Sequence, residues 1–373
     1  MLMKSSAKTA LLENTGIQTA TDVLLVGLDL GTNTSCLLAS PLNSSDTSVR
    51  ELIPSVVGYA SDGIIDGVLP GNATVLFGND ALRRKMHLNL VGPLKGGVIA
   101  DLDSAKKFAV YLRARLNTAP NTEIRAVIGV PAKADPVARE ALRQAFAGVF
   151  DKVLFIPEPF LATLGLRDES RLNDPEYFDP VRNSLFVDIG AGSTDVCLVQ
   201  GYFPGPNDQL STTFAGDAID ALIHEAILQT YPDFQLSLAK VREIKERYSY
   251  VMNPESPALV DIAIAGKTRR LDVTEQIGAG CDALLRHVLG LVKQIVGRAD
   301  PESVPELLQN IVITGGGSLV HGFGVALQTL LVEEGYENPK VSVIGANYKE
   351  VLARGALKAA RQAKDRQWQT ILR

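Results

Sequence analysis

The chain has 373 residues, of which 46 % are hydrophobic and 21 % are charged, close to the average of globular proteins. This length exceeds one ordinary core, so we expect two domains of roughly 150 to 200 residues. The formal net charge of −5 and the lack of a Lys/Arg block disfavour non-specific nucleic-acid binding. No run reaches the roughly 18 apolar residues of a membrane-spanning helix, so none is expected.

The first 22 residues have no continuous apolar core and no cleavage site of a signal peptide. We expect a flexible N-terminal tail over 1–22, with a weak surface anchor or filament contact as the alternative. The three cysteines, Cys36, Cys197 and Cys281, are far apart and lack metal-ligand spacing. They argue against a zinc site or a disulfide framework and favour a reducing cytoplasm.

The first predicted strand is the apolar run VLLVGLDL, residues 23–30, which breaks into a turn of small residues after Asp29. The turn contains Gly31, Thr32 and Asn33. One interpretation is a tight hairpin, and the other is a cradle in which backbone N–H groups hold phosphate oxygens. This stretch alone does not decide between them.

Strand-like and helix-like patterns then alternate along the first half. RAVIGVPA (125–132) and KVLFIPEP (152–159) read as buried strands, and REALRQAFAGVF (139–150) between them has helical spacing. This alternation predicts a mostly parallel sheet that is covered by helices on both faces.

The opening pattern recurs near the middle of the chain. After a polar, Asp- and Pro-rich connection at 167–183 comes SLFVDIGAGSTDVCLV (184–199), again an apolar strand, an Asp, glycines and a second strand. The repeat indicates two halves of similar fold, each contributing one loop to a shared cleft. Chance recurrence of a hairpin is the alternative.

A third glycine-rich strand end lies at NIVITGGGSLVHGF (310–323), ahead of the helical stretch 325–335. Glycines before a helix let backbone N–H groups approach a ligand closely. The sequence contains no G-x-x-x-x-G-K-[ST] motif and no G-x-G-x-x-G with an acidic partner at the expected distance. The P-loop and Rossmann modes of phosphate binding are therefore unsupported.

Six motifs together resemble the actin, sugar kinase and heat-shock chaperone ATPase superfamily. They are GLDLGTNTS, IPEPFLATLGL, VDIGAGSTDV, EIKERYSYV, ITGGGSLVHGF and ARGAL, and their order is that of the superfamily's phosphate loops, connecting helices and adenosine loops. The stretches RAVIGVPAKA, GYFPGPNDQL, FAGDAIDALIHEAIL and RLDVTEQI resemble bacterial actins of the magnetosome-organising MamK family, with the MreB family next. The resemblance covers residues 24 to about 358.

The resemblance implies an α/β fold of the actin-like ATPase type. Two similar α/β domains of mixed sheets, with helices around them, would flank a central nucleotide cleft. Domain I would comprise 23–165 and 346–373, with a small subdomain at about 50–97. Domain II would comprise 166–345, with a small subdomain at about 217–292.

The resemblance also implies that ATP or ADP binds in the cleft with Mg²⁺, which keeps several waters and meets Asp29 and Asp188 through them. Glu158 and Asp188 are the implied catalytic residues, Glu158 orienting or activating the attacking water. The implied nucleotide-binding residues come from both phosphate loops, two helix starts or faces, and the third glycine-rich strand end. They are Asp29, Gly31, Thr32, Asn33, Gly190, Gly192, Ser193, Thr194, Gly216, Asp217, Lys245, Glu246, Gly315, Gly316, Gly317 and Ser318.

Each of these roles has a structural alternative. The two Asp residues also suit turn caps, and Glu158 suits the first turn of a helix. Lys245 and Glu246 could belong to solvated charge pairs on a helix, and Gly216 with Asp217 to a helix N-cap. Cys36 stands where eukaryotic actin has a phosphate-binding Lys, which bacterial relatives also lack. His224 and His321 match no family role and are interpreted as surface or loop histidines.

The implied function is that of a filament protein that binds and hydrolyses ATP and polymerises with itself. In the MamK family such filaments organise magnetosomes, so a cytoplasmic, cytoskeletal location along magnetosome membranes and other magnetosome or membrane-associated proteins as partners are expected. A small-molecule kinase on the same fold, an MreB-like cell-shape protein and a non-polymerising nucleotide-binding clamp are the alternatives.

Overall fold

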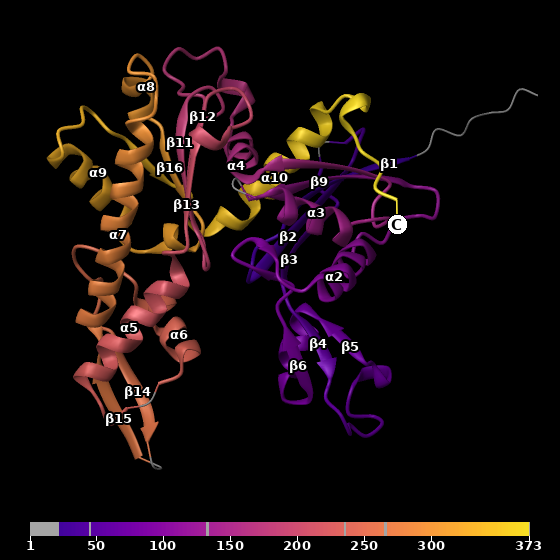
Figure 1. Ribbon diagram of the computed structural model, residues 1–373, viewed down its shortest axis with the longest axis horizontal. Helices are drawn as coiled ribbons and strands as arrows, with labels where there is room; N and C mark the ends of the chain where they lie inside the picture. The colour runs from indigo at the N-terminus through magenta and orange to yellow at the C-terminus, as the bar shows by residue number, and fades with distance from the viewer. Residues whose placement is uncertain (1–21, 45, 132–133, 235, 265–266, 373) are drawn as a thin grey trace, which may run out of the picture.

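A computed structural model describes residues 22–44, 46–131, 134–234, 236–264 and 267–372. The predicted N-terminal tail lies outside these residues apart from Asp22. Figure 1 shows two lobes side by side, the first in indigo to purple and the second in magenta to orange, with the yellow C-terminal helix running between them and onto the first lobe. Each lobe combines one large sheet with helices, as the predicted α/β fold requires.

The first lobe is built on a five-stranded sheet in the order β10-β9-β1-β2-β3. Its strands are β1 (Val23–Asp29), β2 (Thr34–Pro41), β3 (Val49–Pro54), β9 (Glu123–Val130) and β10 (Lys152–Pro157). Side chains alternate along β1, so Leu24, Val26 and Leu28 share one core with α2 and α3, whereas Leu25 faces α4 and α10. These helices are α2 (Leu102–Ala114), α3 (Pro136–Ala145), α4 (Glu158–Leu166) and α10 (Tyr348–Gln362).

The second lobe repeats this plan with a five-stranded sheet in the order β13-β12-β11-β16-β17. Its strands are β11 (Ser184–Ile189), β12 (Thr194–Val199), β13 (Gln209–Thr212), β16 (Ile311–Thr314) and β17 (Val341–Val343). Leu185, Val187 and Ile189 of β11 pack into one large core with the lobe's helices. Those helices are α5 (Gly216–Thr230), α6 (Leu238–Tyr248), α7 (Thr274–Val296), α8 (Val304–Leu308) and α9 (Phe323–Glu333).

The two sheets support the predicted internal duplication down to the register of their hairpins. Asp29 pairs with Cys36 across β1 and β2, and Asp188 pairs with Asp195 across β11 and β12, the same spacing in each lobe. In each sheet two of the four pairings are antiparallel, so the mixed sheets that the resemblance implies are confirmed, and the mostly parallel sheet predicted from the alternation in the first half was wrong. The short glycine turns return the chain at once beside the strand it has just left, which only antiparallel pairing permits.

A small subdomain extends from each sheet, and both lie on the same side of the molecule in Figure 1. The first contains β4 (Val57–Ala60), β5 (Val75–Phe77), α1 (Gly78–Arg83) and β6 (Leu88–Val91), and the hairpin β7 (Leu94–Lys95) and β8 (Val98–Ile99) follows it. The second contains the hairpin of β14 (Leu259–Ile264) and β15 (Lys267–Asp272), next to α5 and α6. The predicted limits of domain I, 23–165 and 346–373, contain every strand of the first five-stranded sheet. The predicted limits of domain II, 166–345, contain every strand of the second.

Helices α4 and α10 join the lobes and cross each other with almost no space between their backbones. A Cβ added to Gly165 would collide with the carbonyl of Val351, and one added to Gly355 would collide with the carbonyl of Leu161. Val351 also shares a buried cluster with Phe186 and Val312 of the second sheet. The paired helices therefore pack against both sheets and hold the ends of their strands toward one space.

Candidate functional site

A cavity of about 500 Å³ lies between the lobes where their strands end. The ends of β1, β11 and β16, the first turns of α4, α5 and α10, and one face of α6 line it. Of the residues predicted for nucleotide binding and catalysis, all but two line this cavity. They are Asp29, Gly31, Thr32, Asn33, Glu158, Asp188, Gly190, Gly192, Ser193, Gly216, Asp217, Lys245, Glu246, Gly315, Gly316 and Gly317.

The two exceptions are Thr194 and Ser318, whose side chains do not belong to the cavity wall. Both are buried, and each hydroxyl donates to a backbone carbonyl: Thr194 to Phe214 at 2.9 Å and Ser318 to Gly315 at 2.7 Å. These two hydroxyls therefore hold neighbouring turns in place, and contact of Thr194 and Ser318 with a nucleotide stays a prediction for their backbone atoms.

Asp29 and Asp188 bring two carboxyl groups from opposite lobes to the same cavity. Each lies at the end of a buried strand, where the turn that follows leaves its side chain facing the cavity. Burial raises the pKa of Asp29 to about 7, against a smaller opposing effect of Lys349. Burial raises the pKa of Asp188 to about 7 as well, and the charges of Asp195 and Asp29 add to the rise. The charge of Asp29 thus acts on Asp188 across the cavity.

Glu158 adds a third carboxyl group from the first residue of α4. A Cβ on Gly129, at the adjoining strand β9, would lie 3.0 Å from the Glu158 Cγ, so the absence of a side chain there leaves room for Glu158. Burial raises the pKa of Glu158 well above its ordinary value, and the charges of Asp29, Asp188 and Asp195 act in the same direction. These carboxyl groups are costly to ionise together unless a cation joins them.

Oxygen donors of this kind suit a hard cation such as Mg²⁺. Within the described residues, however, no group of three or more His, Cys, Asp or Glu side chains is arranged to hold a metal ion by itself. An ion that keeps several waters and takes phosphate oxygens as further ligands fits this donor set, whereas a protein-only metal cage does not.

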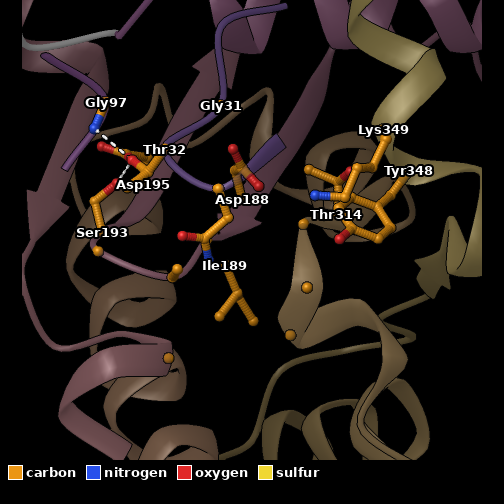
Figure 2. A pocket seen from close by; sticks show the side chains of 18 of the residues that line it. Gly31, Thr32, Gly97, Asp188, Ile189, Ser193, Asp195, Thr314, Tyr348 and Lys349 are labelled. Carbon is orange, nitrogen blue, oxygen red and sulfur yellow. Dashed lines mark hydrogen bonds between the residues drawn. The ribbon is translucent and has the colours of Figure 1, made fainter. Parts of the chain in front are cut away.

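The two glycine turns face each other across the edge of the cavity. On the first lobe, the Gly97 amide donates to Oγ1 of Thr32 at 3.2 Å, and this bond joins the β7–β8 turn to the glycine turn after β1 (Figure 2). On the second lobe, the Ser193 hydroxyl donates to the Asp195 carboxylate at 2.8 Å. The turns present mainly backbone to the cavity, the arrangement that phosphate-binding loops use.

The third glycine-rich strand end closes the cavity below Asp188. Gly315 has a φ of 78°, and a Cβ at this position would collide with the Asp188 carboxylate and the Ile189 carbonyl. Only glycine can adopt this positive φ without strain and also leave the space beside Asp188 and Ile189 free of a Cβ. The short helical turn Gly316–Leu319 follows directly and brings Gly316 and Gly317 to the wall.

Helix α6 contributes a charged wall that is more ordered than a solvated charge pair. The Lys245 side chain is only 15 % exposed, and its amine lies 2.6 Å from the Asp220 carboxylate and donates to the Gly216 carbonyl at 2.9 Å. Glu246 lines the cavity from the next position and is exposed. The alternative of a solvated pair is therefore wrong for Lys245.

Several wall residues were missed by the sequence analysis. Lys349 lies in the first turn of α10, and Figure 2 shows it with Tyr348 facing the same cavity as Asp188. Lys349 precedes the ARGAL motif by four residues on the same helix but is not part of it, so the motif does not mark it. The other wall residues that were not predicted lie next to predicted ones, either in the sequence or in space, and the sequence offers no further signal for them. They include Gly97, Ala191, Asp195, Arg242 and Thr314.

The remaining predictions concern histidines and cysteines. His224 has Nε2 2.8 Å from the Leu236 carbonyl, His321 has Nδ1 3.0 Å from Glu255, and neither lines the cavity. His224 lies on α5 and His321 in the loop before α9, which fits the interpretation as surface or loop histidines. Cys36 is buried, and burial raises its pKa to about 12, so its thiol stays neutral next to the site.

Among the described residues, no helix has both the length and the apolar character needed to cross a membrane.

Comparison with known proteins identifies relatives along nearly the whole chain. Residues 24–364 match the family described as MreB/Mbl protein. The actin-like protein MamK of Paramagnetospirillum magneticum is 32 % identical over 353 residues, which cover 93 % of this chain and 95 % of the relative.

Two solved structures of MamK also match this chain. A MamK double helical filament matches with a TM-score of 0.81 at 30 % identity, covering 92 % of this chain and all of that one. A non-polymerising MamK mutant bound to AMPPNP matches with a TM-score of 0.69 at 31 % identity, covering 91 % of this chain and 99 % of that one. The chain therefore belongs to the MreB/Mbl family and is an actin-like protein similar to MamK.

Proposed function

We propose that this protein binds ATP with Mg²⁺ between its lobes, hydrolyses it, and assembles head to tail into filaments. One observation carries the proposal: Asp29 and Asp188 occupy the same position in two duplicated hairpins and face one cavity from opposite lobes. A nucleotide held there would touch both lobes at once.

The wall residues suit phosphoryl transfer to water, which depends mainly on positioning and on neutralisation of charge. Mg²⁺, when bound, would supply the charge that the phosphates and the carboxylates of Asp29 and Asp188 need. The backbones of the two glycine turns would hold phosphate oxygens from either side. Glu158 would orient a water at the end of the phosphate chain and accept its proton.

Assembly follows from the same geometry. ATP bridging the lobes would set the angle between them, as in hinge-type closure. Head-to-tail contacts between subunits that do not close into a ring produce open filaments. The filament formed by a relative at 30 % identity and the AMPPNP bound by another at 31 % support both parts of this proposal.

We further propose that the filaments position magnetosomes inside a bacterial cell, alongside their membranes and with other magnetosome proteins as partners. The full-length similarity to MamK supports this role over that of a cell-shape protein. Deleting the gene in a magnetosome-forming host and imaging magnetosome chains would test it. Unchanged chains with an altered cell shape would favour the cell-shape role instead.

The experiment that tests the biochemical proposal is pelleting and electron microscopy of the purified chain with ATP, with AMPPNP and without nucleotide. We expect filaments with ATP and AMPPNP, and disassembly as phosphate is released from ATP. Absence of polymer with every nucleotide would contradict assembly. Transfer of phosphate to polyols or small acids in a coupled assay would favour a small-molecule kinase.

A further inference from the structure

Asp220 is a nearly inaccessible carboxylate that holds two cations of the cavity wall. It lies in the second turn of α5 and is 1 % exposed. The guanidinium of Arg242 donates to its Oδ2 at 2.8 Å, and the amine of Lys245 lies 2.6 Å from its Oδ1. Both cations line the cavity, and Asp220 itself does not.

The pair with Lys245 depends on charge more than on a hydrogen bond. Among the described residues, Oδ1 of Asp220 receives no hydrogen bond with suitable geometry, although the Lys245 amine is close. An uncharged side chain of the same shape would therefore leave both cations without their shared anion. Truncating one partner of a buried charge pair costs far more than losing an exposed pair.

Asp217, one turn earlier in α5, does not duplicate this role. Of the residues that the structure describes, it pairs with Arg242 alone, at 2.6 Å, and its side chain is 51 % exposed. Exposed pairs contribute little energy and hold geometry loosely. Asp220 is therefore the residue that sets the relative positions of Arg242 and Lys245.

Backbone hydrogen bonds connect the start of α5 to the glycine turn between β11 and β12. The Gly216 amide donates to the Gly190 carbonyl at 3.1 Å, and the Asp217 amide donates to the Ala191 carbonyl at 2.7 Å. Lys245 in turn donates to the carbonyl of Gly216. A continuous set of contacts thus runs from the cations on α6, through Asp220 and α5, to the loop beside Asp188.

We propose that Asp220 is a positioning residue of the nucleotide site: it places Arg242 and Lys245 on the wall and links them to the Gly190–Ala191 loop. The proposal rests on the proposed function, because it takes the ligand to be an adenine nucleotide. Asp220 acts without touching that ligand, so its effect passes through the two cations.

The first test compares AMPPNP binding by calorimetry, with Mg²⁺ present, in the full chain and in three single variants. We expect Asp220→Asn to weaken binding about tenfold or more, as loss of a buried charge contact does. Asp220→Glu, which keeps the charge, should recover part of the affinity. Asp261→Asn is the matched control, because it breaks an exposed Asp–Arg pair on the β14–β15 hairpin and should bind AMPPNP unchanged.

A double-mutant cycle separates positioning from a merely structural role. If Asp220 acts through the cations, adding Asp220→Asn to the Arg242→Met, Lys245→Met protein should weaken AMPPNP binding no further. If the losses multiply instead, the positioning role is wrong. Should Asp220→Asn fail to fold alone, the triple variant with Asp220→Leu removes all three charges together and serves the same comparison.

The outcomes also separate this inference from the proposed function. A wild-type chain that does not bind AMPPNP would overturn the proposed function. A wild-type chain that binds AMPPNP, together with an Asp220→Asn variant that binds it equally well, would overturn only the positioning role.

Discussion

Gly192 of the second lobe lies directly against Gly96 of the first: a Cβ built on Gly192 would approach the Gly96 Cα to 3.0 Å. Gly96 belongs to the β7–β8 turn, whose next residue, Gly97, donates to Thr32 in the glycine turn after β1. The lobes therefore meet backbone to backbone at the edge of the cavity, and their separation there depends on the lack of side chains.

Gly192→Ala should force the lobes apart at this edge. The φ of Gly192 lies outside the left-handed region, so the added methyl group acts through crowding alone. Overpacking of this kind costs about 1–3 kcal/mol. Bound ADP should consequently dissociate about tenfold faster, as measured by displacement with excess ATP in stopped flow.

The matched control for Gly192→Ala is Gly290→Ala. Gly290 lies inside α7, and a Cβ there would meet no atom within 4 Å. Alanine at such a position stabilises a helix by about 0.5–1 kcal/mol. The control should melt at a slightly higher temperature and release ADP at the wild-type rate. Equal ADP release by Gly192→Ala and the wild type would refute the crowding argument.

Glu158→Ala should separate assembly from hydrolysis. The substitution removes the carboxylate that faces Asp29 and Asp188 but leaves the glycine turns intact. Loss of a general base typically slows a reaction about 10²- to 10⁴-fold. We expect ATP-dependent pelleting to persist while phosphate release becomes slow. Glu140→Gln, an exposed change on α3, serves as the control, and unchanged hydrolysis in Glu158→Ala would remove Glu158 from the mechanism.

The stability of the nucleotide-free, metal-free protein should fall as the pH rises from about 4 to about 7. Asp29 and Asp188 titrate near their ordinary pKa of 3.8 when unfolded but at about 7 when folded. In this window the unfolded chain binds fewer protons, so each group lowers the free energy of unfolding by up to about 1.4 kcal/mol per pH unit. Below about pH 4 and above about pH 7, the contribution of these two groups to the free energy of unfolding no longer changes with pH.

Urea unfolding in EDTA between pH 4.5 and pH 8 measures this dependence. Asp29→Asn removes one titrating group, so its stability should decline less steeply with pH than that of the wild type. Parallel curves for the two proteins would contradict the raised pKa of Asp29. Binding of Mg²⁺ with ATP at pH 6 should release more protons than at pH 8, which calorimetry in buffers of different ionisation enthalpy detects.

Lys349 is expected to be a nucleotide-binding cation that the motifs do not include. Its charge lowers the pKa of both Asp29 and Asp188, and among the described residues it has no carboxylate at ion-pair distance. Lys349→Met should weaken AMPPNP binding about tenfold and raise the Mg²⁺ concentration required, because the cavity loses a positive charge.

Lys349→Arg keeps the charge and should retain most of the affinity. Lys106→Met, an exposed change on α2, is the control for loss of a lysine elsewhere. Wild-type affinity and an unchanged Mg²⁺ requirement in Lys349→Met would mean that its amine does not face the phosphates.

The phosphate-loop part of the site could be predicted because its signal is local. A buried strand, an Asp and a glycine turn occur within a dozen residues, and this pattern is repeated at Asp188. Thr194 and Ser318, predicted by the same reasoning, have hydroxyls that donate to backbone carbonyls and do not line the cavity. A motif identifies which residues belong to a turn, but not which side chains face the ligand and which bind the backbone behind it.

Residues that complete the wall could not be found in this way, because their partners are distant in the chain. Gly97 and Thr32 are 65 residues apart, and the pairing of Asp220 with Arg242 and Lys245 joins two helices. Lys349 reaches the cavity only because α10 returns from the second lobe to the first sheet.

The sequence by itself determined the two strand–Asp–glycine hairpins, their duplication and the glycine at 315 that the Asp188 loop requires, because hydrophobic period and backbone freedom are local properties. Only the tertiary structure decided which charges meet. The pKa values near 7 of Asp29 and Asp188, and the burial of Asp220 between two cations, arise from removal of water and from distances between groups. Those quantities exist only once the two lobes have closed around one cavity.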